Sequence, residues 1–287
     1  MRFDYLAAST IEEALYLLTQ DKGEARVLAG GTDLFLHVRS KRIKPEYVVD
    51  ISDIPDLSGL AYDDQRGLRI GALTSIRTLE TSSEVQSRFP ILAEAAGQLG
   101  SVAIRNVATV GGNLCNARPS AETAQALVAL SAHAVIVGPR GERSLPLENF
   151  FTGVGTTVLE RGELLKEIQV PIMPSGSKGK YYKHSMRGTI DIAIVNAAVV
   201  VTPEDDDKYC CRDVRIVLGA VAPTPMRAIN AERILRGKRL DKILIDEAAR
   251  AASDEAHPRP WSIRGSVAYK KEMVKLITER LLSACIT

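Results

Sequence analysis

The sequence predicts an α+β protein made of three packed units. The chain of 287 residues is long for one hydrophobic core but suits two or three. Short strand-like runs alternate with capped helices up to residue 171, whereas the remaining part has three longer strand-like runs followed by two helices. We place the three units at residues 1–56, 57–174 and 178–287.

The first unit has the pattern of a compact β-α-β fold. Thr10 is expected to cap a helix that carries Glu12 and Glu13 in its first turn, where acidic side chains are favoured. A second helix is expected from residue 34 to about 41. The strands of this unit are predicted at residues 3–6, 26–29 and 47–51.

The second unit is expected to combine antiparallel strands with helices. Residues 63–67 close a hairpin, Thr74 precedes a helix, and Ser120 is expected to cap another helix. Residues 101–116 are rich in Gly, Asn and Thr, and no element is assigned to them. The predicted strands are 57–62, 68–72, 134–137, 143–146 and 167–171, and two further helices are predicted at 90–99 and 121–132.

The third unit follows a linker at residues 174–180 that is rich in Pro, Gly and Ser. Three strand-like runs predict a three-stranded antiparallel sheet, and two helices after it are expected to pack on that sheet. The strands are predicted at 180–185, 193–202 and 210–218, and the helices at 242–252 and 266–284.

Composition and charge argue against several functions. The formal net charge is only +2, and the chain has no basic stripe of the kind that binds nucleic acid. No apolar run reaches the roughly 20 residues of a membrane span, and no apolar signal segment follows Met1. The four cysteines show neither metal-ligand nor disulfide spacing. We therefore expect a cytoplasmic protein that holds no metal of its own.

A first pair of glycines, Gly30 and Gly31, lies between a predicted strand and a predicted helix. Glycines allow a positive φ, and successive N–H groups can form a nest for phosphate oxygens beside the helix N-terminus. The pair is not part of the G-x-G-x-x-G dinucleotide fingerprint. Taken alone, it is better explained by a structural turn.

A second pair, Gly111 and Gly112, is flanked by hydroxyl and amide side chains. Thr109, Asn113 and Asn116 can donate hydrogen bonds to phosphate or ring oxygens. Glu122 follows in the first turn of a predicted helix, where the dipole favours a carboxylate. It could instead accept hydrogen bonds from a ligand.

The two pairs together predict a diphosphate bound between two subdomains, since one pair lies in each of the first two units. The residues alone do not choose among a dinucleotide, a nucleotide sugar and CoA.

These motifs, in this order and spacing, resemble those of the FAD-binding, or medium, subunits of the molybdenum hydroxylase family. That family includes xanthine dehydrogenase and carbon monoxide dehydrogenase. The resemblance is carried by residues 29–34, by residues 109–113 continuing to Glu122, and by residues 183–193. It extends over nearly the whole chain, and the second stretch is its most specific part.

The resemblance implies a two-subdomain FAD-binding unit of the PCMH type, followed by a C-terminal α+β domain. It further implies FAD on this chain, [2Fe–2S] clusters on a small partner subunit, and the molybdenum cofactor on a large one, in a dimer of heterotrimers. Electrons would pass from the clusters through the flavin to an acceptor such as NAD or a quinone. No catalytic or metal-binding residue is implied on this chain.

The resemblance also assigns cofactor-binding residues. One group would lie along the adenosine diphosphate part, a second around the pyrophosphate, and a third around the flavin ring. The first group is Arg26, Val27, Leu28, Ala29, Gly30, Gly31, Thr32, Asp33 and Leu34. The second is Thr109, Gly111, Gly112, Asn113, Asn116 and Glu122, and the third is Leu99, Leu165, Lys183 and Ile192.

The sequence departs from the family pattern at three positions. Many relatives have aspartate where Glu122 stands, and some have aromatic residues in place of Leu99 and Ile192, so stacking on the ring is not implied here. The cysteine-rich insertion of the 4-hydroxybenzoyl-CoA reductases is absent, so no extra cluster is expected.

Two other interpretations stay open at this point. One is a self-contained flavoenzyme of the same superfamily, such as a UDP-N-acetylenolpyruvylglucosamine reductase. That enzyme would need its own substrate cavity and catalytic residues, and the C-terminal part offers no clear set. The other is a non-enzymatic nucleotide-binding module, which bound yellow FAD would exclude.

Overall fold

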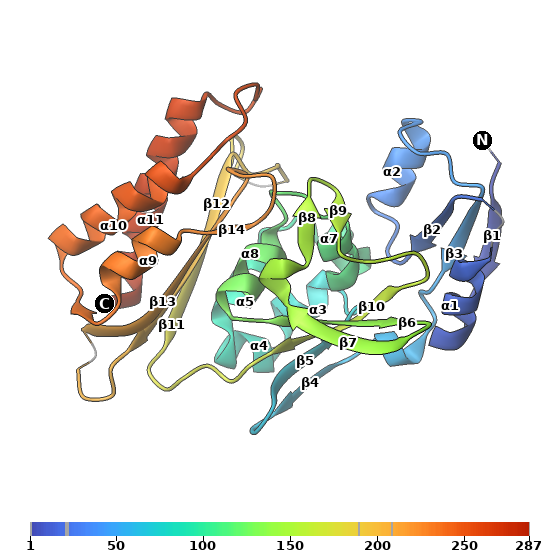
Figure 1. Ribbon diagram of the computed structural model, residues 1–287, viewed down its shortest axis with the longest axis horizontal. Coiled ribbons are helices and arrows are strands. Elements are labelled where there is room, and N and C mark those ends of the chain that lie inside the picture. The colour runs from blue at the N-terminus through green and yellow to red at the C-terminus, as the bar shows by residue number, and fades with distance from the viewer. Residues whose placement is uncertain (1, 21–22, 189, 208, 287) are drawn as a thin grey trace.

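A computed structural model describes residues 2–20, 23–188, 190–207 and 209–286. Figure 1 shows three successive sheets with their helices, the N-terminal sheet at one end of the molecule and the C-terminal sheet at the other. This arrangement confirms the predicted α+β fold class. Within the described part of the chain, no helix is long and apolar enough to cross a membrane.

The N-terminal sheet is parallel, with the strand order β1-β3-β2. Helix α1 begins after Thr10, whose Oγ1 accepts a hydrogen bond from the Glu13 amide at 3.2 Å. Glu13 in turn accepts one from the Ser9 amide at 2.8 Å, so the helix start is fixed from both sides. The elements are β1 (Asp4–Ala7), α1 (Ile11–Thr19), β2 (Ala25–Leu28), α2 (Leu34–Arg39) and β3 (Tyr47–Asp50).

The middle sheet has the order β4-β5-β10-β6-β7 and is antiparallel throughout, with most of the helices of this unit on one side. Its strands are β4 (Leu60–Asp63), β5 (Gly67–Gly71), β6 (His133–Gly138), β7 (Gly141–Pro146) and β10 (Leu164–Val170), and β8 (Phe151–Gly153) pairs with β9 (Thr156–Thr157). Its helices are α3 (Ile76–Thr81), α4 (Ser83–Arg88), α5 (Pro90–Gly97), α6 (Val102–Val107), α7 (Val110–Cys115) and α8 (Glu122–Ala129), with 3-10 turns η1 (Pro55–Leu57) and η2 (Leu147–Asn149).

Two predictions for this unit need correction. The prediction that Ser120 caps the helix at 121–132 was wrong, because α8 begins at Glu122 after Ala121, whose methyl group cannot accept a hydrogen bond. Residues 101–116, for which no element was predicted, contain α6 and α7. Their caps are hydroxyls, since Ser101 and Thr109 each accept a hydrogen bond from the amide three residues further on.

The C-terminal unit contains the predicted antiparallel sheet of three long strands. Two short strands, which no sequence periodicity predicted, pair with the third long strand and extend the sheet. The strands are β11 (Lys178–His184), β12 (Val195–Pro203), β13 (Cys210–Gly219), β14 (Met226–Arg227) and β15 (Lys238–Arg239). The helices are α9 (Ile229–Leu235), which was not predicted, α10 (Lys242–Glu255) and α11 (Val267–Ile286).

Strand β12 connects the last two units, because it is buried on both faces. Side chains alternate across a strand, so Val199 and Val201 pack among the helices of the C-terminal unit. Ala198 and Val200 point the other way, into the core of the middle unit. The predicted boundary between residues 174 and 178 therefore separates two sheets that share a hydrophobic core.

A buried hydrogen-bond network joins the same two units. The Asn196 side-chain amide on β12 donates to Tyr181 Oη at 3.0 Å and to Gln125 Oε1 at 3.2 Å. Gln125 belongs to α8, all of whose residues are buried, and its own amide donates to the Pro119 carbonyl at 3.1 Å. The network ties α8 to the C-terminal sheet.

Asn196→Ala is expected to lower the free energy of unfolding by about 1–3 kcal/mol, because Gln125 Oε1 would be left buried without its donor. Urea denaturation followed by circular dichroism measures this loss. Asn149→Ala, at an exposed position of η2, is the control and should change stability by less than about 0.5 kcal/mol. Equal losses in the two variants would contradict the proposed importance of the network.

Candidate functional site

The first glycine pair lies against the end of α6. A Cβ atom on Gly30 would stand 2.0 Å from the Val107 carbonyl oxygen, so only glycine allows this approach. Gly31 has a φ of +67°, a conformation that favours glycine. The fold therefore brings the loop between β2 and α2 directly beside the segment that leads to Thr109.

The backbone amides of this loop point to a ligand. Among the described residues, no intramolecular acceptor is found for the N–H groups of Gly30, Gly31, Thr32 and Asp33. Asp33 precedes α2 and makes no side-chain cap hydrogen bond. Successive open amides beside a residue of positive φ form the nest that binds phosphate oxygens. The structure thus fits a phosphate group at this loop.

The second glycine pair differs, because it lies within the first turn of α7. Val110 donates its amide to the Thr74 carbonyl at 2.9 Å, Gly111 to the Ala72 carbonyl at 2.8 Å, and Gly112 to Thr109 Oγ1 at 3.1 Å. Neither glycine has a positive φ.

Gly111 and Gly112 also differ in their surroundings. A Cβ on Gly111 would meet Ala72 atoms at 2.7–2.8 Å, which explains glycine there as close packing. Gly112 is exposed, and a Cβ there would stand 2.9 Å from Thr109 Oγ1, so that hydroxyl would have to shift to admit a side chain. The open position lies beside two partly buried amide side chains, Asn113 and Asn116. Asn113 Oδ1 accepts a hydrogen bond from Thr123 Oγ1 at 2.5 Å, and its amide nitrogen, for which the described residues supply no acceptor, can donate to a ligand.

A buried ion pair closes the inner side of the site. Lys183 Nζ on β11 lies 2.7 Å from Glu122 Oε1 at the start of α8, and the two side chains are 1% and 11% exposed. The same ammonium group donates to the Gln98 carbonyl at 2.9 Å, at the end of α5. Burial raises the pKa of the Glu122 carboxyl against the attraction of Lys183, and the charge of Asp33 raises it further. Asp33 therefore lies within electrostatic reach of Glu122.

The remaining predicted residues occupy three kinds of position. Leu99 is buried next to Gln98, and Leu165 is buried in β10 one residue before the Lys166 carbonyl that accepts the Ala72 amide. Ile192, 49% exposed in the loop between β11 and β12, lies on the surface. In the first group, Leu28 is buried beside Gly31, whereas Arg26 and Val27 are exposed and Arg26 pairs with Glu24. The outer residues Ala29 and Leu34 are partly buried.

Sequence reasoning missed several contacts that shape the site. The Gln98 carbonyl carries no side-chain signal, and the Tyr181–Asn196–Gln125 network behind the ion pair joins residues far apart in sequence. Arg118 Nη2 lies 3.1 Å from His37 Nε2, which links α2 to the segment after α7. Cys115, the last residue of α7, is partly buried, and the desolvation of its thiol raises the pKa of that group to about 12, so it stays protonated at neutral pH.

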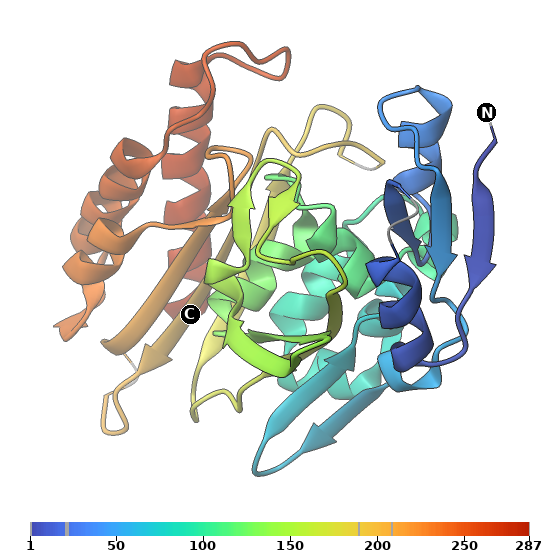
Figure 2. The ribbon, with the colours of Figure 1, turned by 45° about the vertical axis from the view of Figure 1, so that its right-hand side comes forward.

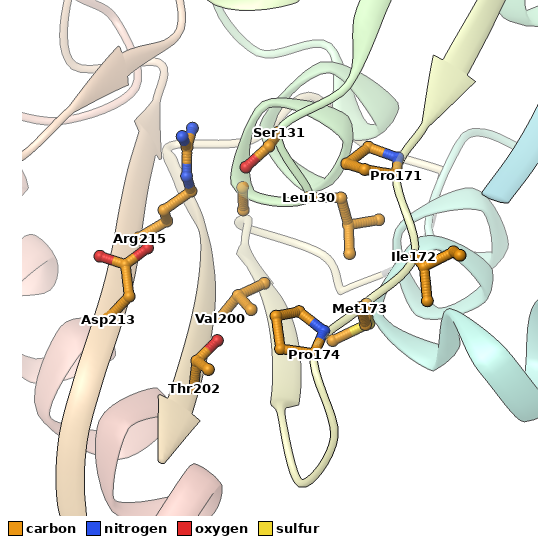
Figure 3. Close-up of a pocket in the computed structure, with 11 residues that line it drawn as sticks. Leu130, Ser131, Pro171, Ile172, Met173, Pro174, Val200, Thr202, Asp213 and Arg215 are labelled. Atoms are coloured by element: carbon orange, nitrogen blue, oxygen red, sulfur yellow. The ribbon is translucent and has the colours of Figure 1, made fainter. Parts of the chain in front are cut away.

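Other parts of the molecule offer weaker sites. Figure 3 shows a small cavity of about 100 Å³ between the segment Pro171–Pro174, which follows β10, and the strands that carry Val200 and Arg215. That volume is below the roughly 300 Å³ of ordinary ligand pockets. Among the described residues, no cluster of three His, Cys, Asp or Glu side chains could hold a metal ion.

Two family models match the chain. Residues 1–173 match the FAD binding domain in molybdopterin dehydrogenase, and residues 180–285 match the CO dehydrogenase flavoprotein C-terminal domain. The chain belongs to this family of molybdenum hydroxylase flavoprotein subunits. The expected family membership is therefore confirmed, and with it the class of the protein as a subunit of an oxidoreductase.

Relatives within the family align over almost their whole length. The carbon monoxide dehydrogenase medium chain of Hydrogenophaga pseudoflava is 35% identical over 99% of this chain and 96% of its own. The xanthine dehydrogenase FAD-binding subunit of Escherichia coli O157:H7 is 30% identical over 98% of this chain and 95% of its own.

Solved structures in the family share the fold. The carbon monoxide dehydrogenase structure from Hydrogenophaga pseudoflava superposes with a TM-score of 0.94 and 36% identity, covering 99% of this chain and 97% of the other. Quinoline 2-oxidoreductase from Pseudomonas putida 86 gives a TM-score of 0.91 with 29% identity, covering 100% of this chain and 97% of the other. The predicted order of an FAD-binding part followed by a C-terminal flavoprotein domain is confirmed.

Lys183→Met should lower the stability of the flavin-free protein by about 3–5 kcal/mol near pH 8, because Glu122 would stay buried without its counter-charge. Without Lys183 the pKa of Glu122 rises further above its ordinary value of about 4.3. A raised carboxyl pKa gives stability that is present at low pH and lost as pH rises through that pKa. The loss should therefore be smaller near pH 5, which urea denaturation at the two pH values measures.

Lys180→Met is the matched control on the same strand. Lys180 pairs with Glu94 at 3.0 Å, but the two side chains are 44% and 34% exposed, so its loss should cost less than about 1 kcal/mol. A similar and pH-independent loss of stability in both variants would contradict the interpretation that buried Glu122 depends on Lys183 for its counter-charge.

Proposed function

We propose that this chain binds one FAD without a covalent bond and passes electrons from the [2Fe–2S] clusters of a partner subunit to an external acceptor. The membership of the chain in the family gives the class of cofactor. The open amides of residues 30–33 carry the proposal, because they form a phosphate nest in which the described residues supply no acceptor. An FAD pyrophosphate would supply the missing acceptors.

The pyrophosphate would be held from two sides. The Gly30–Asp33 amides would bind it from the first loop, aided by Arg26 to Leu34 along the adenosine part. Across from them lie the exposed Gly112 and the partly buried Asn113 and Asn116, whose side-chain amides can donate to phosphate and ribitol oxygens. Thr109 is buried beneath them, where its hydroxyl caps α7. Gly111 would serve by packing on Ala72, which places its neighbour Gly112 at this surface.

The flavin ring would lie toward the buried ion pair. Leu99 and Leu165 would give apolar contacts, and Ile192 would cover the ring from the exposed loop after β11. Lys183 would face the polar edge of the ring while Glu122 and the Gln98 carbonyl hold its ammonium group in place. A positive charge fixed in a dry site stabilises negative charge that develops on a neighbouring group.

Bound FAD supplies the redox chemistry, and the chain supplies binding, orientation and electrostatics. We propose that the substrate is hydroxylated on a large molybdenum-cofactor subunit and that a small iron–sulfur subunit delivers the electrons. The acceptor would be NAD or a quinone, and the assembly a dimer of heterotrimers. Relatives named as a medium chain or an FAD-binding subunit support a multi-subunit arrangement.

Gly112→Val should weaken FAD binding at least about a hundred-fold with little effect on the fold. The valine would project from the exposed position that we assign to the pyrophosphate, and its Cβ, 2.9 Å from Thr109 Oγ1, would require only that side-chain hydroxyl to shift. Losing two charge-assisted hydrogen bonds of about 1.5–3 kcal/mol each accounts for such a loss. Fluorescence titration of the flavin-free protein gives the FAD dissociation constant, and thermal melting gives the stability.

Gly111→Ala is the comparison variant. Its methyl group would collide with Ala72, so it should melt earlier even without flavin. If Gly112→Val binds FAD like the parent protein, the pyrophosphate lies elsewhere and the assigned site is wrong.

The chain expressed alone should carry flavin but neither iron nor molybdenum, because the described cysteines are free and scattered. Metal analysis and the visible spectrum test this expectation. Iron–sulfur absorption in the isolated chain, or flavin that stays on the chain after acid precipitation, would contradict it.

A further inference from the structure

The loop between α10 and α11, residues 256–266, presents two large apolar side chains to solvent. Trp261 is 89% exposed and Ile263 is 91% exposed. Trp261 is also the only tryptophan of the chain. Single exposed apolar residues are ordinary, but a nearly bare tryptophan next to a nearly bare isoleucine is typical of the centre of a binding surface.

The same loop carries positive charge that the described part of the chain does not neutralise. Arg259 and Arg264 flank the apolar pair, and neither makes an ion pair with any described residue. Lys270 lies at the base of the loop, and burial lowers the pKa of its ammonium group. The positive charges of Arg259 and Arg264 lower that pKa further. Lys270 is 5% exposed and donates to the Ala220 carbonyl at 3.0 Å.

Other arginines of the C-terminal unit, in contrast to Arg259 and Arg264, do form ion pairs. Arg227 and Arg236 both bind the buried carboxylate of Glu232, and Arg239 binds Asp207. Glu255, near the loop in sequence, is turned away and accepts the amides of Asn230 and Ala231. The loop is therefore a local excess of cations in a chain whose net charge is only +2.

The loop is held in place from behind. His257 donates its amide to the Val221 carbonyl at 2.9 Å, and Pro258 is buried. At its other end, Tyr269 Oη lies 2.8 Å from His184 Nε2. A surface that is fixed before binding loses less entropy on association.

The loop also lies near the candidate flavin site. His184 directly follows Lys183, and the Ala220 amide donates to the Pro119 carbonyl at 2.7 Å, just before Glu122. In Figures 1 and 2 the loop stands at the same end of the C-terminal sheet as the connection between β11 and β12.

We propose that the α10–α11 loop is the docking surface for a partner protein chain that presents carboxylates around an apolar pocket for Trp261. An acidic rim would neutralise Arg259 and Arg264, and the pocket would bury Trp261 and Ile263. This inference rests on the proposed function, since it names the surface that would receive another subunit of the complex near the flavin.

Hydroxyl-radical footprinting with mass spectrometry tests the inference on the isolated chain and on the complex purified through a tag on this chain. Trp261 should be oxidised at least ten-fold more slowly in the complex. An oxidation rate of Trp261 that is the same in the complex and in the isolated chain would overturn the proposal. Protection of Trp261 that grows with the concentration of the isolated chain would also overturn it, because the occupant would then be a second copy.

Two variants test the chemistry of the surface. Trp261→Ala and the double change Arg259→Glu with Arg264→Glu should each weaken retention of the partner chains at least ten-fold. Ile243→Ala, which removes an 81% exposed apolar side chain from the start of α10, should not. Melting temperature and FAD content should stay at the parent values in all three. Normal partner retention in the loop variants, or oligonucleotide binding that the charge reversal abolishes, would refute the docking surface.

FAD content separates this inference from the proposed function. A parent protein that binds no FAD overturns the proposed function and, with it, this inference. A protein that binds FAD normally but retains its partners despite the loop variants overturns the docking surface alone.

Discussion

The buried contact between Lys183 and Glu122 is the constraint on which the rest of the candidate site depends. Three elements meet at it, because Lys183 comes from β11, Glu122 from the start of α8, and the Gln98 carbonyl from the end of α5. A charge that loses its partner in a dry interior is costly. The three elements therefore have to keep their relative positions. Fixing the start of α8 also fixes the segment before it, which runs back to α7.

This constraint acts through a core that crosses the predicted unit boundary. Helix α8 is buried along its whole length, and β12 gives one face to each of two units. The Tyr181–Asn196–Gln125 network lies between α8 and the C-terminal sheet. It fixes the orientation of the helix on the sheet, since hydrogen bonds specify orientation where apolar contacts do not. The C-terminal unit is thus part of the wall of the site. Separating it at the linker would expose apolar surface and remove Lys183 from Glu122.

The sequence was sufficient to predict the helices and strands that have strong local signals. The capped helix after Thr10 and the three long C-terminal strands follow from caps and periodicity, and all are present. It was not sufficient for α6 and α7, because helices of six residues depend on tertiary contacts more than on propensity. The pairing of Lys183 with Glu122 joins residues 61 positions apart, which no local pattern encodes. The residue pattern alone led only to a diphosphate, and the choice of FAD came from the resemblance to a family.

The two glycine pairs show why such a pattern is ambiguous. The first pair precedes a helix and the second lies in the first turn of one. Gly31 is glycine because of a positive φ, and Gly111 because Ala72 leaves no room for a side chain. The amides of the first loop are open, whereas those at the start of α7 already have acceptors. The second motif therefore contributes mainly through side chains and position. Since Gly30 lies against the Val107 carbonyl just before Thr109, the segment around the second pair also fixes where the open amides of the first loop stand.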